Sequence, residues 1–198
     1  GDWSSDVCSS DLSLLPLNKS TIAFLSKSYN KQYRVAYVAV GIDTANTMAS
    51  RMKNEFGADL FFFNYKKDAG NVLSQSELIK RNYDYIVIGV HNYSRRPANN
   101  FGISKPALDF VQRLLESPNS TLMMFGNPYA AKNFCNARRV LACYEDHPLI
   151  QSAAFDILTG QKSPEGKLPV TICEAFPYGA GLSYPLSSFL SRSYLPDE

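Results

Sequence analysis

Apolar and polar residues follow one another along the chain in blocks that switch between two periods. Residues 34–40 (RVAYVAV) form a run of β-branched and apolar residues. Residues 44–56 then place Met48, Met52 and Phe56 at a helical spacing. This change from strand to helix recurs about five times. Such alternation is typical of a parallel sheet whose strands are connected by helices.

The same reading predicts the elements of the fold. Residues 85–90 (YIVIGV) form the clearest strand, because a central strand of a parallel sheet is apolar on both faces. We predict strands over 34–40, 60–63, 85–90, 121–125, 140–143 and 168–172. We predict helices over 44–56, 73–82, 105–116, 129–135 and 148–158, the last ending at Gly160. The predicted fold class is α/β, a three-layer α/β/α sandwich with a mainly parallel sheet of about five or six strands.

Both ends of the chain lack this alternation. Residues 1–12 (GDWSSDVCSSDL) can be read as a translated sequencing adapter, so we set them aside as non-native; the alternative is a native disordered tail. Residues 13–33 are interpreted as a linker that starts with an extended connector at 13–18. Residues 34–184 form the predicted domain, and 185–198 a linker to a possible further domain.

Composition and charge exclude several classes of protein. The chain has 198 residues, of which 45% are hydrophobic and 19% charged, as in an ordinary globular domain. No apolar run approaches the ~18 residues of a membrane span. The formal net charge is only +2, and the pairs Arg95-Arg96 and Arg138-Arg139 build no basic stripe. We therefore predict neither a membrane span nor a nucleic-acid partner.

Cysteine and histidine usage argues against cross-links and metals. Outside residues 1–12 the cysteines are Cys135, Cys143 and Cys173, an odd number without CxxC spacing. This argues against a disulfide framework or a zinc site, and we expect all three to be buried as small apolar side chains. His91 and His147 are too few to hold a metal without a clustered third ligand. We predict no metal and no cofactor.

Polar side chains gather where the predicted strands end, which is where ligands bind in sheets of this class. The longest connection, residues 91–104, follows the predicted central strand. Two adjacent arginines with an asparagine suit a carboxylate, a sugar hydroxyl or a partner domain. The alternative is a solvated loop whose arginines pair with surface acids. The candidate binding or interface residues are His91, Asn92, Arg95, Arg96 and Asn127.

Glu145, Asp146 and His147 precede the helix predicted over 148–158. The two acids could form a general acid/base pair, which needs a carboxyl group with a tuned pKa. Acids just ahead of a helix that begins with Pro are more often N-capping groups, which is the interpretation we favour. We assign no catalytic residue, and Glu145 is kept as the one candidate.

One motif resembles a known family. Residues 166–171 (GKLPVT), after a helix and a turn, resemble a recurring signature of glycoside hydrolase family 3, where this segment closes a C-terminal α/β sandwich. Residues 89–96 (GVHNYSRR) and 125–129 (FGNPY) look most similar to its β-N-acetylglucosaminidase (β-N-acetylhexosaminidase) branch. Further segments follow in the family's order at 15–17 (LPL), 140–145 (VLACYE) and 151–154 (QSAA), and the resemblance covers roughly residues 14–184.

The resemblance implies an accessory domain of a retaining glycosidase that removes terminal β-N-acetylglucosamine. The nucleophilic Asp would belong to a barrel domain of the same chain, ahead of residue 13, so the fragment alone would be inactive. In this branch a His–Asp pair on a barrel loop handles the proton. The sandwich would shape one side of the sugar site through residues 91–96. The implied partners are the barrel and an N-acetylglucosamine-containing saccharide, and the implied location is periplasmic or exported.

Other functions remain open on the sequence. A domain of the family's β-glucosidase branch often carries an acid/base Glu, with which Glu145 does not align securely. A stand-alone α/β module would bind a sugar or nucleotide without any barrel. A small hydrolase using Glu145 and His147 would turn over substrate by itself.

Overall fold

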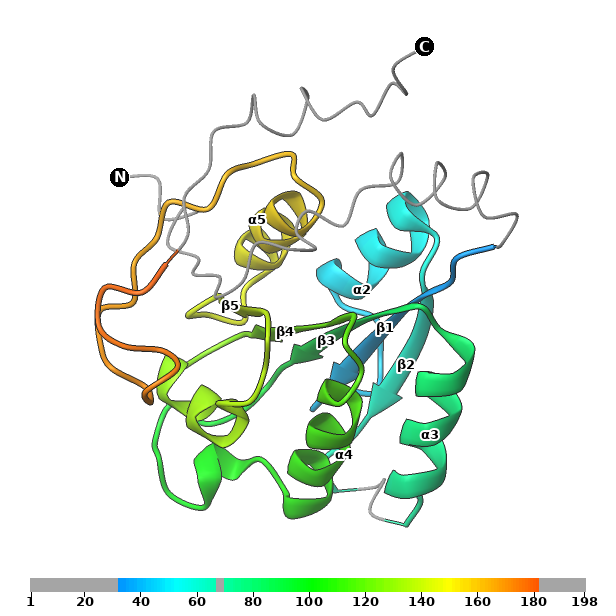
Figure 1. Cartoon of the computed structure of the whole chain (residues 1–198), viewed down its shortest axis with the longest axis horizontal. Coiled ribbons are helices and arrows are strands. Elements are labelled where there is room, and N and C mark those ends of the chain that lie inside the picture. Colours follow the sequence, from blue (N-terminus) through cyan, green and yellow to red (C-terminus); the bar gives the residue numbers. More distant parts are fainter. Residues whose placement is uncertain (1–31, 67–69, 182–198) are drawn as a thin grey trace.

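The computed structural model describes residues 32–66 and 70–181 and shows a five-stranded sheet with the order β2-β1-β3-β4-β5. Every pairing between neighbouring strands is parallel (Figure 1). The strands are β1 (Val35–Val40), β2 (Asp59–Phe63), β3 (Tyr85–Val90), β4 (Ser120–Met124) and β5 (Val140–Ala142). The predicted α/β class is confirmed, and five of the six predicted strands are present.

Helices connect the strands and cover both faces of the sheet (Figure 1). They are α2 (Thr47–Arg51), its continuation as the π-helix η2 (Met52–Phe56), α3 (Val72–Asn82), α4 (Lys105–Leu115) and α5 (Pro148–Leu158). Two 3₁₀-helices are η3 (Asn100–Gly102) and η4 (Pro128–Phe134). The helix predicted over 44–56 begins at Thr47, because the Asn46 side chain caps it by accepting a hydrogen bond from the Ala49 N–H at 2.9 Å.

Two apolar layers hold the sheet between its helices. On the face covered by α3 and α4, the rings of Phe63 and Phe110 stack with centroids 4.6 Å apart. On the face covered by α2 and α5, Met48, Met52 and Phe155 are buried. Every residue of β1 and β3 is buried, because each strand has a neighbour on both sides and helices above and below.

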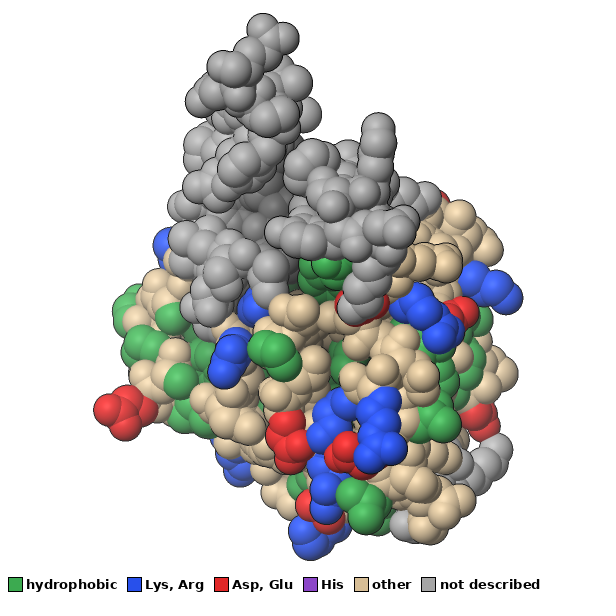
Figure 2. Space-filling view, turned by 45° about the vertical axis from the view of Figure 1, so that its right-hand side comes forward, with side chains coloured by type: hydrophobic (Ala, Val, Ile, Leu, Met, Phe, Trp, Pro, Cys, Tyr) green, Lys and Arg blue, Asp and Glu red, His purple; other side chains and the backbone are tan. Residues whose placement is uncertain are grey.

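Charged residues of both signs alternate on the surface. Figure 2 shows Lys and Arg side chains interspersed with Asp and Glu on one face. Lys80 contacts both Glu77 and Glu116, and Arg34 contacts Asp59 at 2.8 Å. In the described ranges, no helix is long and apolar enough to cross a membrane.

The sixth predicted strand, over 168–172, is wrong. These residues lie outside any strand, because their backbone bonds close within the segment that follows α5. The Leu168 N–H donates to the Ala180 carbonyl at 2.7 Å, and the Ile172 N–H donates to that of Phe176 at 2.9 Å. Pro169 has no N–H to offer a sheet. The segment is therefore a compact coil whose Leu168 and Phe176 side chains enter the core.

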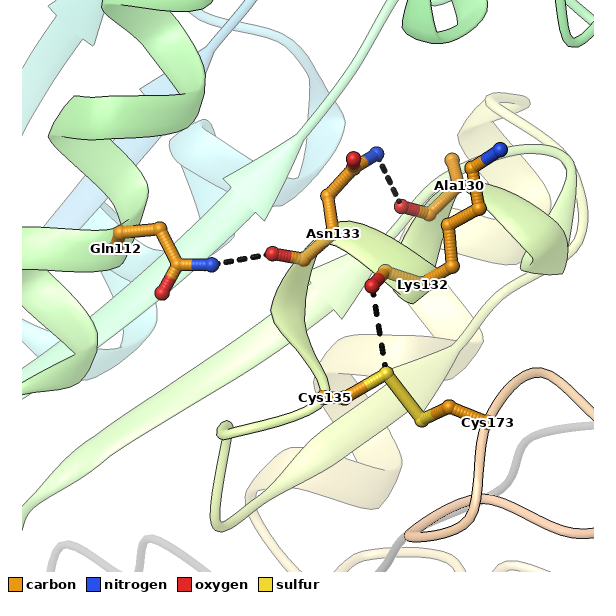
Figure 3. The surroundings of a disulfide bond; sticks show 6 residues. All are labelled: Gln112, Ala130, Lys132, Asn133, Cys135 and Cys173. Carbon is orange, nitrogen blue, oxygen red and sulfur yellow. Dashed lines mark hydrogen bonds between the residues drawn. A yellow bond between two sulfur atoms is a disulfide. The ribbon is translucent and has the colours of Figure 1, made fainter.

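The cysteine prediction also needs correction. Cys135, which follows η4, and Cys173, in the segment after α5, form a disulfide (Figure 3). Their spacing in the sequence does not show this pair, because it depends on η4 packing beside the later segment. Cys143 is buried as expected, with 2% of its surface exposed. The predictions for residues 1–12, 13–18 and 185–198 concern parts of the chain outside the described residues.

Gly89 lies in the middle of β3 with no room for a side chain. A Cβ there would overlap the Tyr37 hydroxyl and lie 2.7 Å from His91 Nε2. We expect Gly89→Ala to lower the free energy of unfolding by about 1–3 kcal/mol, because both neighbours are fully buried and cannot move aside. Chemical denaturation measures the change.

Gly70→Ala is the matched control, since a Cβ there meets nothing within 4 Å. Its effect should stay within about 0.5 kcal/mol. Equal stability of the two variants would contradict the close packing described at β3.

Candidate functional site

The polar residues predicted as a site lie at one edge of the sheet, because all five parallel strands end there. We call residues 91–104, 125–129 and 143–147 the carboxyl-edge loops; they follow β3, β4 and β5. The strand order also creates a switch point between β1 and β3, whose connections leave in opposite directions. Ligands of such sheets bind in the crevice at that point.

In this protein its own atoms fill the switch point. His91, directly after β3, is completely buried, and its N–H donates to the Val40 carbonyl at 2.8 Å. The Tyr65 hydroxyl donates to the His91 carbonyl at 2.6 Å. Gly41 has φ 98°, and a Cβ there would overlap that same carbonyl oxygen. The crevice between β1 and β3 is therefore part of the core.

The His91 ring uses both of its nitrogens. Nδ1 lies 3.0 Å from Asp146 Oδ1, and Nε2 lies 2.8 Å from the Tyr37 hydroxyl. A ring protonated at Nδ1 donates to the carboxylate and accepts from the tyrosine, so one tautomer satisfies both contacts. Asn46 Nδ2 lies 3.3 Å from Nδ1, and the Phe125 ring stacks on the imidazole at 4.4 Å.

Asp146 joins this ring to two further segments. Its Oδ2 accepts from the Asn92 N–H at 2.9 Å, and its Oδ1 accepts from Gln151 Nε2 at 2.7 Å. Gln151, on α5, also accepts from the Met48 N–H of α2 at 3.2 Å. One carboxylate thus connects β3, β5 and α5.

The pKa values follow from this burial and bonding. Burial alone raises the pKa of Asp146, but the hydrogen bonds from His91, the Asn92 N–H and the Gln151 amide outweigh it. The resulting pKa is lower than that of an ordinary Asp. Burial, and then the charge of Asp146, raise the pKa of Tyr37 well above its usual range. Its hydroxyl therefore stays protonated as a donor at neutral pH.

A His–Asp pair can perform proton transfer, but the histidine of this pair is closed to substrate. None of the His91 side chain is exposed, whereas 26% of the Asp146 side chain is. A general acid or base must come within hydrogen-bonding reach of the reacting group. The pair therefore positions the loops after β3 and β5, and the predicted candidate His91 lies beneath the surface and not on it.

A second group of predicted residues meets at the surface. Arg95 Nη2 lies 3.7 Å from Glu145 Oε1, and Asn127 Nδ2 donates to the Arg95 carbonyl at 2.9 Å. The Tyr93 hydroxyl donates to the Asn127 carbonyl at 3.3 Å. Arg95, Asn127 and Glu145 thus come from the three carboxyl-edge loops, and Arg95 contacts both of the others. Arg96 is exposed, and its N–H donates to Ser94 Oγ at 3.0 Å.

The asparagines of the first loop have a conformational role. Asn92, Asn99 and Asn100 all have φ between 51° and 52°, in the left-handed region that asparagine tolerates better than most residues. Phe101 shares this conformation with φ 61°, and its ring is buried with 1% exposed. The main role of the exposed candidate Asn92 is therefore to let the backbone adopt the left-handed conformation at this position. Its N–H also donates to Asp146.

The capping prediction for Glu145 and Asp146 is wrong. The N-cap of α5 is His147, whose Nδ1 accepts from the Leu149 N–H at 3.3 Å. Asp146 turns inward to His91, and Glu145 turns outward to Arg95. Because both acids have partners elsewhere, the next residue, His147, forms the N-cap of α5.

Sequence reasoning missed three residues of the buried network. Tyr37 lies in a plain apolar run, Asn46 ahead of a helix and Gln151 within one, and no spacing connects any of them to position 91. Only the sheet order brings them together. Within the described parts of the chain, no group of three or more His, Cys, Asp or Glu side chains could hold a metal ion.

No protein-family model matches the sequence, and neither does any curated protein. Solved structures do match. A fungal multi-domain family 3 β-N-acetylglucosaminidase has a TM-score of 0.63 at 15% identity, over 92% of this chain and 19% of that chain. The β-glucoside phosphorylase BglX has a TM-score of 0.56 at 19% identity, over 87% of this chain and 30% of that one.

A family 3 β-N-acetylglucosaminidase from Paenibacillus sp. str. FPU-7 has a TM-score of 0.54 at 17% identity, over 70% of this chain and 27% of its own. The chain therefore spans less than a third of the length of each of these enzymes. At such identities the likeness concerns the fold. The chain has the α/β fold found in a domain of family 3 enzymes.

The Asp146 carboxylate should stabilise the fold in a pH-dependent way. Because its pKa is lowered on folding, its contribution is complete above the unfolded pKa of about 4 and is lost as pH falls through the folded value. We expect Asp146→Asn to cost about 1–3 kcal/mol at pH 7. The gap to wild type should shrink towards pH 3, as measured by urea denaturation across this range.

Asp109→Asn is the control, because Asp109 forms an exposed pair with Lys105 at 3.0 Å. Such a pair is worth only about 0.3–0.5 kcal/mol. A stability gap for Asp146→Asn that stays constant from pH 7 to pH 3 would refute the assigned role of the carboxylate.

Proposed function

We propose that this chain is the accessory α/β domain of a family 3 glycoside hydrolase that removes terminal β-N-acetylglucosamine. Its carboxyl edge would form one side of the sugar site. The observation that carries the proposal is the contact among Arg95, Asn127 and Glu145, which joins three loops at the ligand-binding edge of the sheet.

Sequence and fold support the proposal independently. The GKLPVT segment at 166–171 resembles a signature of family 3, and the GVHNYSRR segment at 89–96 resembles its β-N-acetylglucosaminidase branch. Two of the structures that share the fold are described as family 3 β-N-acetylglucosaminidases. Fold alone never fixes function, so the residues at the edge carry the proposal.

At the carboxyl edge, some side chains hold the loops in place and others are available to bind a ligand. The Asn127 side chain is fully engaged, since Oδ1 accepts from the Tyr129 N–H and Nδ2 donates to Arg95. Arg95 itself presents a side chain that is 89% exposed. Its pair with Glu145 at 3.7 Å is weak in water, so a ligand oxygen can replace the carboxylate. Arg95 and Arg96 are thus the donors, and Asn127 and Glu145 position Arg95.

The chemistry would take place on another domain. In the proposed parent enzyme, the nucleophilic carboxylate and the proton-handling pair belong to a barrel that precedes residues 34–184, and a linker at 185–198 leads onward. The present domain would orient the sugar, which lowers the entropic part of the barrier. The periplasmic or exported location is part of the same proposal.

The parent enzyme with Arg95→Ala and Arg96→Ala tests this assignment. We expect KM for a chromogenic N-acetyl-β-glucosaminide to rise about tenfold, since two charge-assisted hydrogen bonds to the sugar are lost. Steady-state kinetics of the folded variant measure the change.

Arg81→Ala with Arg138→Ala is the matched control. Arg81 lies in the last turn of α3 and Arg138 precedes β5, so both lie at the opposite edge of the sheet. Their replacement removes the same charge as the Arg95/Arg96 variant. Unchanged kinetics in the Arg95/Arg96 variant would reduce the domain to a scaffold. A wild-type parent without activity on this substrate would refute the proposed branch.

The β-glucosidase branch is a second candidate, favoured by the fold shared with BglX and by the exposed Glu145 carboxyl at the edge. If Glu145 is the acid/base, Glu145→Gln in the parent should lower kcat on an aryl β-glucoside about 10²–10⁴-fold. If Glu145 only positions Arg95, kcat should hold and KM should change modestly. Comparing kcat and KM on glucoside and N-acetylglucosaminide substrates separates the two roles.

The chain by itself tests the remaining alternatives. Calorimetric binding of N-acetylglucosamine or a nucleotide without a barrel would favour a stand-alone binding module. Turnover that disappears in Glu145→Gln and His147→Ala would favour a small hydrolase. We expect no turnover, because His147 caps α5 and Glu145 faces Arg95. We expect no binding by the chain alone, because its carboxyl edge would form only one side of the sugar site.

A further inference from the structure

The Cys135–Cys173 disulfide joins two parts of the domain that differ in how they are held. Cys135 directly follows η4, whose backbone is anchored: the Gln112 side chain of α4 donates to the Asn133 carbonyl, and Asn133 Nδ2 donates to the Ala130 carbonyl at 3.1 Å (Figure 3). Phe134 next to it is fully buried. Cys135 is therefore attached to a part of the domain that is firmly held in place.

The other side is a segment without regular structure. Residues 161–181 follow α5, and the hydrogen bonds of their backbone are largely internal, as between Gly179 and the Leu168 carbonyl at 2.8 Å. The Lys167 ammonium also bonds within the segment, to the Gly181 carbonyl at 2.7 Å. Leu168 and Phe176 bury their side chains in the core. Cys173 lies between these two residues in the sequence and attaches the segment covalently to Cys135.

The disulfide lies where a reagent can reach it. Both cysteines are half-buried, and their neighbours Asn136 and Glu174 are exposed. Cys135 Sγ lies 3.3 Å from the Lys132 carbonyl, so a reduced thiol at this position already has an acceptor (Figure 3). The Cys143 sulfur, in contrast, is enclosed in the core below α5.

We propose that Cys135–Cys173 is a redox-controlled clasp that fixes residues 161–181 against η4 when oxidised and releases them when reduced. The reductant is a dithiol. One of its thiolates attacks a disulfide sulfur and forms a mixed disulfide, and the displaced cysteine takes up a proton. The second thiol then displaces the other cysteine, which leaves two protein thiols and the oxidised reductant.

The clasp is independent of the proposed glycosidase function, because it depends only on the two cysteines and the segment between α5 and residue 181. A closed clasp requires a compartment in which disulfides persist, such as the periplasm or the cell exterior. It thus adds a separate argument for the exported location proposed above.

Limited trypsin digestion of the full chain, before and after treatment with a dithiol, tests the clasp. Lys162 and Lys167 are exposed within the segment, and cleavage needs local release of the backbone. We expect reduction to speed cleavage at these sites about tenfold, and reoxidation to reverse it. Cleavage at Lys53 and Lys80, in the helical layers, should stay unchanged.

Variants and mapping complete the test. Cys173→Ser should be cleaved at the fast rate with or without the dithiol, while Cys8→Ser, outside the described residues, should behave as wild type. Peptide mapping of the oxidised chain should recover Cys135 linked to Cys173. Equal cleavage of oxidised and reduced wild type, equal acceleration at all lysines, or unlinked cysteines after oxidation would each overturn the proposal, and none of these readouts requires a variant to fold.

Discussion

A histidine ring that is closed to water needs a hydrogen-bond partner for each of its nitrogens. In this domain the two hydrogen bonds of one such ring connect three segments of the sheet and its loops. The partners of His91 are Asp146 after β5 and Tyr37 within β1, so the two segments must lie on either side of β3. Leaving a buried polar group without its partner costs about 1–3 kcal/mol, a large share of a domain's stability. The ends of β3 and β5 and the middle of β1 are thus tied to one imidazole.

The layers of the fold could be predicted from the sequence, because strands that are buried on both faces, such as β1 and β3, are continuous apolar runs. The wrong prediction of a strand over 168–172 has the same origin. An apolar pattern indicates which side chains are buried, and Leu168 is buried, but it belongs to a coil and not to a strand. Whether a buried run pairs with a strand depends on where its N–H groups find acceptors, which no local pattern shows.

The surface part of the site was predictable, but of the buried part only His91 was among the predicted candidates. Arg95 and Asn127 stand out because they follow strands in a polar stretch, and the structure brings them into contact. The network beneath them was hidden, since Tyr37 and Gln151 look like ordinary core and helix residues and their partners are distant in sequence. The cysteine pair was hidden too, because counting cysteines says nothing about which distant segments pack together.

The left-handed stretch in the loop after β3 has a consequence for how this domain can change over evolutionary time. Asn99, Asn100, Phe101 and Gly102 are consecutive residues with positive φ, and the ring of Phe101 must arrive in the core at the end of that curl. Surface loops usually accept insertions and deletions freely. Here one added residue would shift the aromatic ring out of its place and bring another side chain into a backbone conformation that few residues adopt. The length of this loop is therefore fixed by backbone handedness, although its exposed side chains remain free to vary.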